Sequence, residues 1–306
     1  MKKECSLIAT IPAMTNLDYV EYVIACHDIS GVRWNSGIVT PYSPFRTIEI
    51  LDSLVKKYKK KLWVDIKGRQ LRVINWTVPL CSCIKINHPV KITGRAKVIL
   101  RGEQASEIIK SDNNCIYVSP VPKHYVGEGQ SLNIIGDDVE IQGYLTESDK
   151  EYLESCRILN IHDIMASFVE TAQDIAEIKQ ITPQASVYAK IESRKGVECV
   201  DSICGDNHAS GLVSARDDLY IELGCPYKMM HALQNIIRKD AHAVCASRIF
   251  ISLEHSDNPS FSDFEDLEAM YRMGYRQYML CDNICNYAFD KAVRAWKEFI
   301  YESHFK

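Results

Sequence analysis

The chain contains no block of basic residues. Its 306 residues carry 36 Lys and Arg against 40 Asp and Glu, a formal net charge of −4, and no arginine-rich arm or lysine stripe with interleaved aromatic residues occurs. A surface that binds nucleic acid normally concentrates positive charge to neutralise phosphates. Nucleic acid is therefore not the expected partner.

The sequence also lacks any apolar run of the roughly 18 residues needed to span a bilayer. The segment MKKECSLIATIPAM begins with two lysines, but Glu4 interrupts the charge pattern and the apolar stretch is too short for a signal peptide. The segment predicts a first strand instead. We expect no membrane partner and a cytoplasmic location.

Paired Cys-x-x-Cys motifs are absent as well, although the chain has 12 cysteines. Many of them lie within apolar segments such as YVIAC and AVCAS, which predicts buried free thiols in a reducing compartment. Cys81 and Cys83 have no second pair of ligands beside them, so a structural metal site is disfavoured there.

Eight short apolar runs alternate with amphipathic segments over most of the chain. The amphipathic segments between most runs are long enough to be crossover helices. The runs are SLIAT, GVRWN, KLWVDI, DIMASFV, SVYAKIE, SGLVSA, AVCAS and QYMLC. Eight strand-helix units that close on themselves form a (β/α)8 TIM barrel, so the sequence predicts this α/β fold.

One interval interrupts the alternation. Over residues 72–144 the helical period disappears, and short β-type runs such as AKVILRG and CIYVSPV lie between turn residues. We predict a small all-β domain at residues 72–144, inserted after the third barrel strand between the first part of the barrel (residues 1–71) and the second (residues 145–306). Thr146 and Asp149 predict the helix start at which the barrel resumes.

Polar side chains recur at the carboxyl ends of the predicted strands. Each one alone is unremarkable, because strand ends approach solvent. In a TIM barrel, however, these ends surround one mouth, where catalytic groups lie. The residues are Thr10, Arg33 with Asn35 and Ser36, Asp65 with Lys67, Ser167, Lys190 with Glu192, Arg216 with Asp217 and Asp218, Ser247 and Asp282.

Lys190 and Glu192 are two apart on one predicted strand and therefore point to the same side, toward the barrel interior. On their own they fit a structural ion pair as well as a catalytic role. Glu192 and Asp218 end adjacent strands, and two converging carboxylates suit Mg²⁺ or Mn²⁺. Arg33 and Lys190 add positive charge, which favours a small substrate with phosphate or carboxylate groups.

These segments resemble the pyruvate kinase family, in chain order. SLIATIPA is similar to the family's opening strand, GVRWNSG to its Arg-x-Asn-x-Ser-His-Gly segment and VDIKGRQLR to Asp-Thr-Lys-Gly-Pro-Glu-Ile-Arg. Further along the chain, AKIESRKG is similar to Ala-Lys-Ile-Glu, GLVSARDDLY to Val-Ala-Arg-Gly-Asp-Leu-Gly and VCASRIF to Cys-Ala-Thr-Gln-Met. The resemblance implies metal-dependent phosphoryl transfer between phosphoenolpyruvate and an acceptor, ADP by default, giving pyruvate through an enolate.

The resemblance also implies a role for each matching residue. Lys190 would neutralise the transferred phosphoryl group, Arg33 would contact phosphate, and Ser247 would help to protonate the enolate. Glu192 and Asp218 would hold Mg²⁺ or Mn²⁺. The implied K⁺ ligands are Asn35, Ser36 and Asp65, and the implied substrate-binding residues are Arg216, Asp217, Arg72 and Lys67.

Several positions depart from the family pattern. The glycines on either side of the metal aspartate are Asp217 and Tyr220, and a family glutamate and lysine are Gln70 and Gln130. Most departures fall on the side where the family holds ADP, and the family's C-terminal regulatory domain has no counterpart. Two alternatives therefore stay open: nucleotide-independent enolate chemistry on a 2-oxo acid, of decarboxylase or lyase type, and a non-catalytic protein that binds phosphoenolpyruvate or pyruvate. The oligomeric state is also open.

Overall fold

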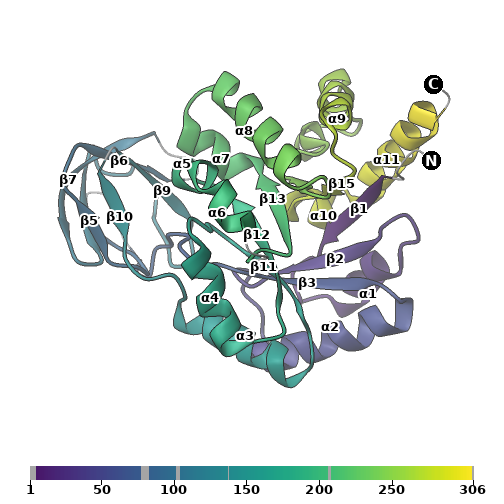
Figure 1. The fold of residues 1–306 in the computed structure, drawn as a ribbon, viewed down its shortest axis with the longest axis horizontal. Helices are drawn as coiled ribbons and strands as arrows, with labels where there is room; N and C mark the ends of the chain where they lie inside the picture. Colours follow the sequence, from purple (N-terminus) through teal and green to yellow (C-terminus); the bar gives the residue numbers. More distant parts are fainter. Residues whose placement is uncertain (1–4, 77–82, 101–103, 137, 206–207, 305–306) are drawn as a thin grey trace. The chain divides into compact units, whose positions relative to one another are not determined.

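The computed structural model divides the chain into two compact units. One is formed by Met1–Ile66 with Glu151–Lys306, and the other by Lys67–Lys150. The structure describes all residues except 1–4, 77–82, 101–103, 137, 206–207 and 305–306 (Figure 1).

The first unit is a closed barrel of eight parallel strands, which confirms the predicted (β/α)8 TIM barrel. Each strand lies within one of the eight apolar runs named from the sequence. In sheet order they are β1 (Ser6–Thr10), β15 (Gln277–Met279), β14 (Val244–Ala246), β13 (Gly211–Ala215), β12 (Ser186–Ile191), β11 (Asp163–Ala166), β3 (Lys61–Ile66) and β2 (Gly31–Asn35), and β2 pairs with β1.

Helices cover the outside of this barrel (Figure 1). They are α1 (Leu17–Ala25), α2 (Pro44–Tyr58), α3 (Glu147–Ile158), α4 (Ala172–Ile181), α5 (Arg194–Glu198), α6 (Val200–Cys204), α7 (Arg216–Leu223), α8 (Pro226–Lys239), the 3-10 helix η2 (Ile251–Glu254), α9 (Phe261–Met273), α10 (Asp282–Tyr287) and α11 (Phe289–His304). None of the helices in the described segments has the length and apolar character needed to cross a bilayer.

The local sequence explains how such a helix forms, as α2 illustrates. Its N-cap, Ser43, accepts a hydrogen bond from the backbone N–H of Arg46, and a proline occupies the first turn. Ile48, Leu51 and Val55 recur at spacings of three and four and are buried against the barrel.

Two layers of side chains fill the barrel interior. An apolar layer is formed mainly by Ile8, Trp63, Met165, Tyr188, Val213, Val244 and Met279. Two residues further along four of these strands, on the same inward face, the side chains become polar but stay buried: Thr10, Asp65, Ser167 and Lys190. The polar layer therefore lies at the carboxyl ends of the strands, above an apolar floor.

The second unit contains two antiparallel sheets. The five-stranded sheet has the order β4 (Cys83–Lys85), β8 (Cys115–Ser119), β7 (Ser106–Asp112), β6 (Ala96–Leu100) and β9 (Leu132–Gly136), and the two-stranded sheet pairs β5 (Val90–Ile92) with β10 (Val139–Ile141). Alternating residues such as Ile84, Val98 and Ile116 are fully buried in its core. Its assignment as an inserted domain bounded by residues 72 and 144 stays a prediction.

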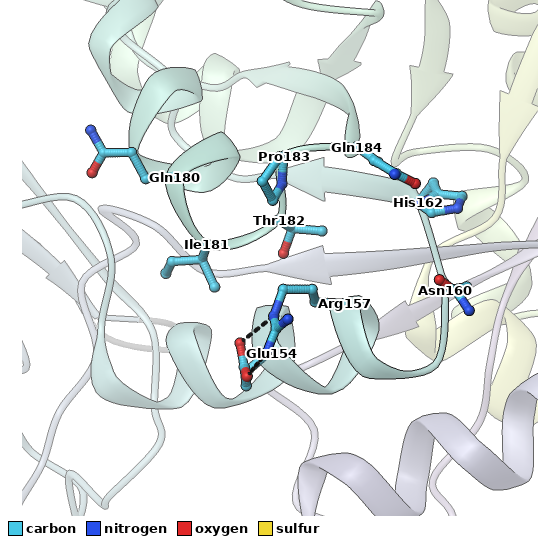
Figure 2. A pocket seen from close by; sticks show the side chains of 9 residues that line it. All are labelled: Glu154, Arg157, Asn160, His162, Gln180, Ile181, Thr182, Pro183 and Gln184. Carbon is cyan, nitrogen blue, oxygen red and sulfur yellow. Dashed lines mark hydrogen bonds and ion pairs between the residues drawn. The ribbon is translucent and has the colours of Figure 1, made fainter.

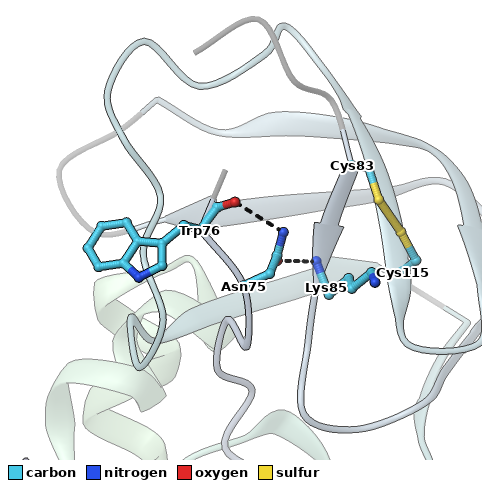
Figure 3. Close-up of a disulfide and its surroundings, with 5 residues drawn as sticks. All are labelled: Asn75, Trp76, Cys83, Lys85 and Cys115. Atoms are coloured by element: carbon cyan, nitrogen blue, oxygen red, sulfur yellow. Dashed lines mark hydrogen bonds between the residues drawn. A yellow bond between two sulfur atoms is a disulfide. The ribbon is translucent and has the colours of Figure 1, made fainter. Parts of the chain in front are cut away.

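Cys83 on β4 and Cys115 on β8 form a disulfide (Figure 3). The ladder pairs Cys83 with Tyr117 and Cys115 with Lys85, so the two cysteines are diagonal neighbours with Cα atoms 6.4 Å apart, within disulfide reach. The prediction of free thiols was wrong for this pair, because the spacing of cysteines does not reveal strand register. Nine other described cysteines are free, and Cys81 lies outside the described residues.

Candidate functional site at the carboxyl end of the barrel

Asp65 is the centre of the polar layer. Its buried carboxylate accepts hydrogen bonds from Arg33 (Nε to Oδ2, 2.7 Å), from Lys190 (Nζ to Oδ2, 3.2 Å) and from Ser167 (Oγ to Oδ1, 3.1 Å). These side chains come from β2, β12 and the end of β11, and β3 carries Asp65 itself. One carboxylate thus links four neighbouring strand ends.

Lys190 is surrounded by polar and charged side chains. Its Nζ donates to Ser167 Oγ at 2.8 Å and lies 3.1 Å from Glu192 Oε1. Burial lowers the pKa of Lys190, but the carboxylates of Asp65 and Glu192 outweigh this effect and raise the pKa above its ordinary value. Lys190 therefore carries its positive charge at neutral pH.

Glu192 is held by a strained backbone segment. Its Oε2 accepts a hydrogen bond of 2.8 Å from the backbone N–H of Phe168, a non-glycine residue with φ of +50°. Such a conformation costs about 1–3 kcal/mol and is found preferentially at functional sites. Here it aims the amide of Phe168 at the carboxylate.

The electrostatics of Glu192 fit a cation. Burial raises its pKa, Lys190 lowers it, and Asp218 and Asp65 raise it again, so the pKa lies above its ordinary value. Burial is the largest of these effects, and a cation bound beside the carboxylate would offset it. Across the described residues no three His, Cys, Asp or Glu side chains form a metal-sized cluster. A divalent ion at Glu192 and Asp218 would fill its remaining positions with substrate and water oxygens, as Mg²⁺ commonly does.

Besides Asp65, Arg33 has two partners to which the sequence assigned no role, Thr10 and Asp282. Its Nη1 donates to Thr10 Oγ1 at 3.2 Å and lies 3.3 Å from Asp282 Oδ2, while Asn35 Nδ2 donates to Asp282 Oδ1 at 3.0 Å. Burial lowers the pKa of Arg33, but Asp65 and Asp282 outweigh it and the pKa is raised. In the sequence, the only indication that Thr10 and Asp282 belong to the site was their position at the ends of predicted strands.

The expected K⁺ ligands lie at the adjoining ends of β2 and β3. The backbone N–H of Ser36 donates to the carbonyl of Asp65 at 3.1 Å, and Asn35 Oδ1 accepts from the N–H of Gly37 at 3.1 Å. Within the described part of the chain the buried hydroxyl of Ser36 has no hydrogen-bond partner, which fits a ligand for a cation. The carboxylate of Asp65, in contrast, is already engaged by Arg33 and Lys190.

Arg216 fixes the segment that follows β14. Its buried guanidinium donates to the carbonyl of Ser247 (Nη2, 2.6 Å) and to Asp266 Oδ1 on α9 (Nη1, 2.7 Å). Ser247 and the next residue, Arg248, have φ of +66° and +61°. The structure therefore directs Arg216 toward protein acceptors, and its expected contact with substrate stays a prediction.

Lys67 and Arg72 belong to the other compact unit. The backbone N–H of Lys67 donates to Asp149 Oδ1 at 2.7 Å, and Arg72 donates to the carbonyl of Gly129 at 2.6 Å and to Gln70 Oε1 at 2.8 Å. Their expected contacts with substrate stay predictions.

A cavity of about 710 Å³ lies elsewhere on the first unit (Figure 2). It is lined by residues that precede β11 and β12, including His162 and Gln184, and by Glu154 and Arg157, which pair with each other. It lies at the amino-terminal ends of the strands. Catalytic groups of TIM barrels gather at the opposite ends, so the buried charges rather than this cavity identify the candidate site.

The fold and these charges define a TIM-barrel protein whose buried ion-pair network lies at the catalytic end of the barrel. The model of the pyruvate kinase barrel domain matches residues 92–286, and the chain belongs to the pyruvate kinase family.

Individual relatives agree with this assignment. The chain is 23% identical over 280 residues to a pyruvate kinase of Borreliella burgdorferi, covering 81% of the chain and 57% of the relative. It is 29% identical over 165 residues to pyruvate kinase 2 of Candida glabrata, covering 51% of the chain and 32% of the relative. The chain thus spans about a third to a little over half of these relatives.

A solved structure is similar in fold. The crystal structure of a pyruvate kinase from Cryptosporidium parvum covers 97% of the chain with a TM-score of 0.76 at 20% sequence identity, and 68% of that structure is covered. At this level of identity the similarity concerns the fold.

Proposed function

We propose that the protein transfers a phosphoryl group between phosphoenolpyruvate and an acceptor, with ADP as the default acceptor, and forms pyruvate through its enolate. The observation that carries the proposal is the position of Lys190, whose Nζ lies 3.2 Å from Asp65 and 3.1 Å from Glu192 at the carboxyl end of a pyruvate kinase family barrel. We further propose a cytoplasmic location.

In the proposed reaction the bond between phosphorus and the enol oxygen breaks, and its electron pair stays on that oxygen. An oxygen of the acceptor forms the new bond to phosphorus. Lys190 and Arg33 supply fixed positive charge for the phosphoryl oxygens, and such positioning and charge carry most of the catalysis of phosphoryl transfer. Ser247 helps to deliver the proton that converts the enolate to pyruvate.

Glu192 and Asp218 are the proposed ligands of Mg²⁺ or Mn²⁺. When bound, the divalent ion supplies charge that stabilises the enolate oxygen. The proposed K⁺ ligands are Asn35, Ser36 and Asp65.

The substrate carboxylate is proposed to lie at the first turn of α7, near the amides of Asp217 and Asp218. Lys67 and Arg72 are proposed as further substrate contacts, and Arg216 acts through its hold on Ser247.

Phosphorus NMR tests the proposal. Protein with phosphoenolpyruvate, Mg²⁺ and K⁺ is followed with and without ADP, and we expect the phosphoenolpyruvate signal to convert to ATP signals only with ADP present. Lys190→Met provides the matched inactive control. Phosphoenolpyruvate that stays intact in both samples would contradict ADP-dependent transfer.

The replacement of two glycines by Asp217 and Tyr220 on α7 favours a second candidate, nucleotide-independent enolate chemistry on a 2-oxo acid. Pyruvate release from oxaloacetate without nucleotide, abolished by Glu192→Gln, is the result expected for this candidate.

A further inference from the structure

The segment after β14 is held in an unfavourable backbone conformation. Ser247 and Arg248 are consecutive non-glycine residues in the left-handed region, with φ of +66° and +61°. Arg216 fixes the segment through two hydrogen bonds to the carbonyl of Ser247, from Nη2 at 2.6 Å and from Nε at 3.2 Å, and Asp266 fixes Arg216 in turn. This geometry directs the side chain of Arg248 toward α7.

Arg248 makes only loose contacts with α7 among the residues that the structure describes. Its Nη1 lies 3.7 Å from Asp217 Oδ1, beyond hydrogen-bond distance, and its Cζ lies 5.6 Å from the ring centre of Tyr220. The side chains of Arg248 and Asp217 are 47% and 48% exposed. A guanidinium has five N–H donors, so Arg248 retains donors for a further acceptor.

The two buried arginines of the mouth, Arg33 and Arg216, differ from Arg248 because protein acceptors hold their guanidinium groups. Arg33 donates to Asp65 and Thr10, and Arg216 donates to Ser247 and Asp266. The orientation of each is therefore already set by protein acceptors, and a large reorientation would leave a buried partner unpaired. Within the described part of the chain Arg248 has no buried contact of this kind.

The negative charge of Asp217 makes the positive charge of Arg248 important for substrate binding. The proposed function puts the substrate carboxylate at the first turn of α7, where the carboxylate of Asp217 would repel it. Arg248 lies close enough to offset this charge, and its planar fork suits a carboxylate.

We propose that Arg248 determines specificity for a substrate carboxylate: it neutralises Asp217 and donates hydrogen bonds to the carboxylate of a small enol or 2-oxo acid. This inference rests on the proposed function. It makes Asp217 and Arg248 a coupled pair, in which the loss of Arg248 is harmful because Asp217 is present.

A double-mutant cycle tests the coupling. Binding of phosphoenolpyruvate in the presence of Mg²⁺ is measured by titration calorimetry for the native protein, Arg248→Gln, Asp217→Gly and the double variant. We expect Arg248→Gln to weaken binding about tenfold, Asp217→Gly to bind at least as tightly as the native protein, and the double variant to recover to within about threefold of it.

Further variants separate recognition from folding. Arg248→Lys keeps the charge but not the planar fork and should recover only part of the affinity. Arg248→Met should match Arg248→Gln. Both variants should keep the native melting temperature because the side chain is half exposed. Arg272→Gln is the matched control, since Arg272 pairs with Glu268 on the exposed face of α9 and should not affect binding.

The outcomes distinguish the two proposals. Native protein that binds phosphoenolpyruvate, with Arg248→Gln binding equally well, would overturn the role of Arg248 alone. Additive effects in the cycle would overturn the coupling to Asp217. Native protein that binds neither phosphoenolpyruvate nor pyruvate would overturn the proposed function and this inference with it.

Discussion

At the scale of single residues, Lys190 has the largest predicted effect. It places a positive charge 3.2 Å from Asp65 and 3.1 Å from Glu192. Because that charge stabilises the phosphoryl oxygens in the proposed reaction, Lys190→Met should lower the rate of phosphoryl transfer about a hundred- to a thousandfold. Affinity for Mg²⁺ should stay equal or rise, because a cation beside Glu192 is removed.

Coupled kinetics and Mn²⁺ titration measure both quantities for Lys190→Met. The substitution also leaves buried carboxylates with less compensation, so a loss of about 3 kcal/mol in the free energy of unfolding is expected. A folded variant with full turnover would contradict the assignment of Lys190.

Glu192 is the residue on which metal binding is predicted to depend most. Glu192→Gln keeps an oxygen for the N–H of Phe168 but removes the negative charge. We expect the affinity for Mg²⁺ or Mn²⁺ to fall at least about tenfold, measured by calorimetry or by Mn²⁺ resonance. Glu268→Gln on α9 is the control, and equal metal affinity in the two variants would remove Glu192 from the ligand set.

At the scale of elements, the segment after β14 depends on Arg216. Arg216→Lys keeps the charge but replaces the guanidinium that contacts both the carbonyl of Ser247 and Asp266. A misplaced Ser247 should lower kcat by up to about a hundredfold while KM for phosphoenolpyruvate changes little. A raised KM at constant kcat would instead indicate that Arg216 contacts substrate.

Helix α7 carries a pH-sensitive carboxyl group. Burial, Glu170 and Asp218 raise the pKa of Glu222 and Arg194 lowers it, which together brings the pKa to about 7. Between the ordinary value of 4.5 and about 7 the folded protein holds a proton that the unfolded chain has released, so the stability contributed by this group declines as pH rises through that window.

Thermal unfolding in the presence of a chelator checks this linkage. The melting temperature of the native protein should fall from pH 5 to pH 7.5 relative to Glu222→Gln, in which the group cannot titrate. Parallel pH profiles for the two proteins would be inconsistent with the raised pKa.

At the scale of the whole molecule, the two compact units should respond differently to reduction. The disulfide between Cys83 and Cys115 spans 32 residues of the chain and lies wholly within Lys67–Lys150. Closing a loop of this length stabilises a fold by up to about 4 kcal/mol.

Hydrogen exchange before and after reduction measures this difference. Amides of β4, β7 and β8 should lose protection, while those of the barrel strands should not. Cys83→Ser should reproduce the effect, and Cys156→Ser, a change at a buried free cysteine, is the control for thiol loss. Unchanged protection throughout would contradict a stabilising role for the disulfide.

The sequence was sufficient to predict the barrel, because eight apolar runs ended in polar residues and the spacing left room for crossover helices. It also predicted that Lys190 and Glu192 share one face, since a strand has a period of two. It did not predict Asp65 as the shared partner of Arg33 and Lys190, because contacts across strands depend on the register and tilt of the closed sheet.

The same limit explains the other differences. The direction of the Arg216 side chain depends on the left-handed backbone at Ser247. The pairing of Cys83 with Cys115 depends on the register between β4 and β8, which the alternation of apolar and polar residues does not define. The departures at Asp217 and Tyr220 were visible in the sequence, but their joint contact with Arg248 required the three-dimensional arrangement.

The apolar floor beneath the polar layer has a consequence for the order of binding. Packed apolar side chains screen charges poorly, so the field of the charges above them is directed outward through the mouth. Arg33 and Lys190 contribute two positive charges, and Asp65, Glu192, Asp218 and Asp282 contribute four negative ones. We therefore expect the empty mouth to repel phosphate, and a divalent ion bound as proposed would cancel this excess of negative charge. We therefore expect ordered binding, in which the divalent ion binds first and the anionic substrate second.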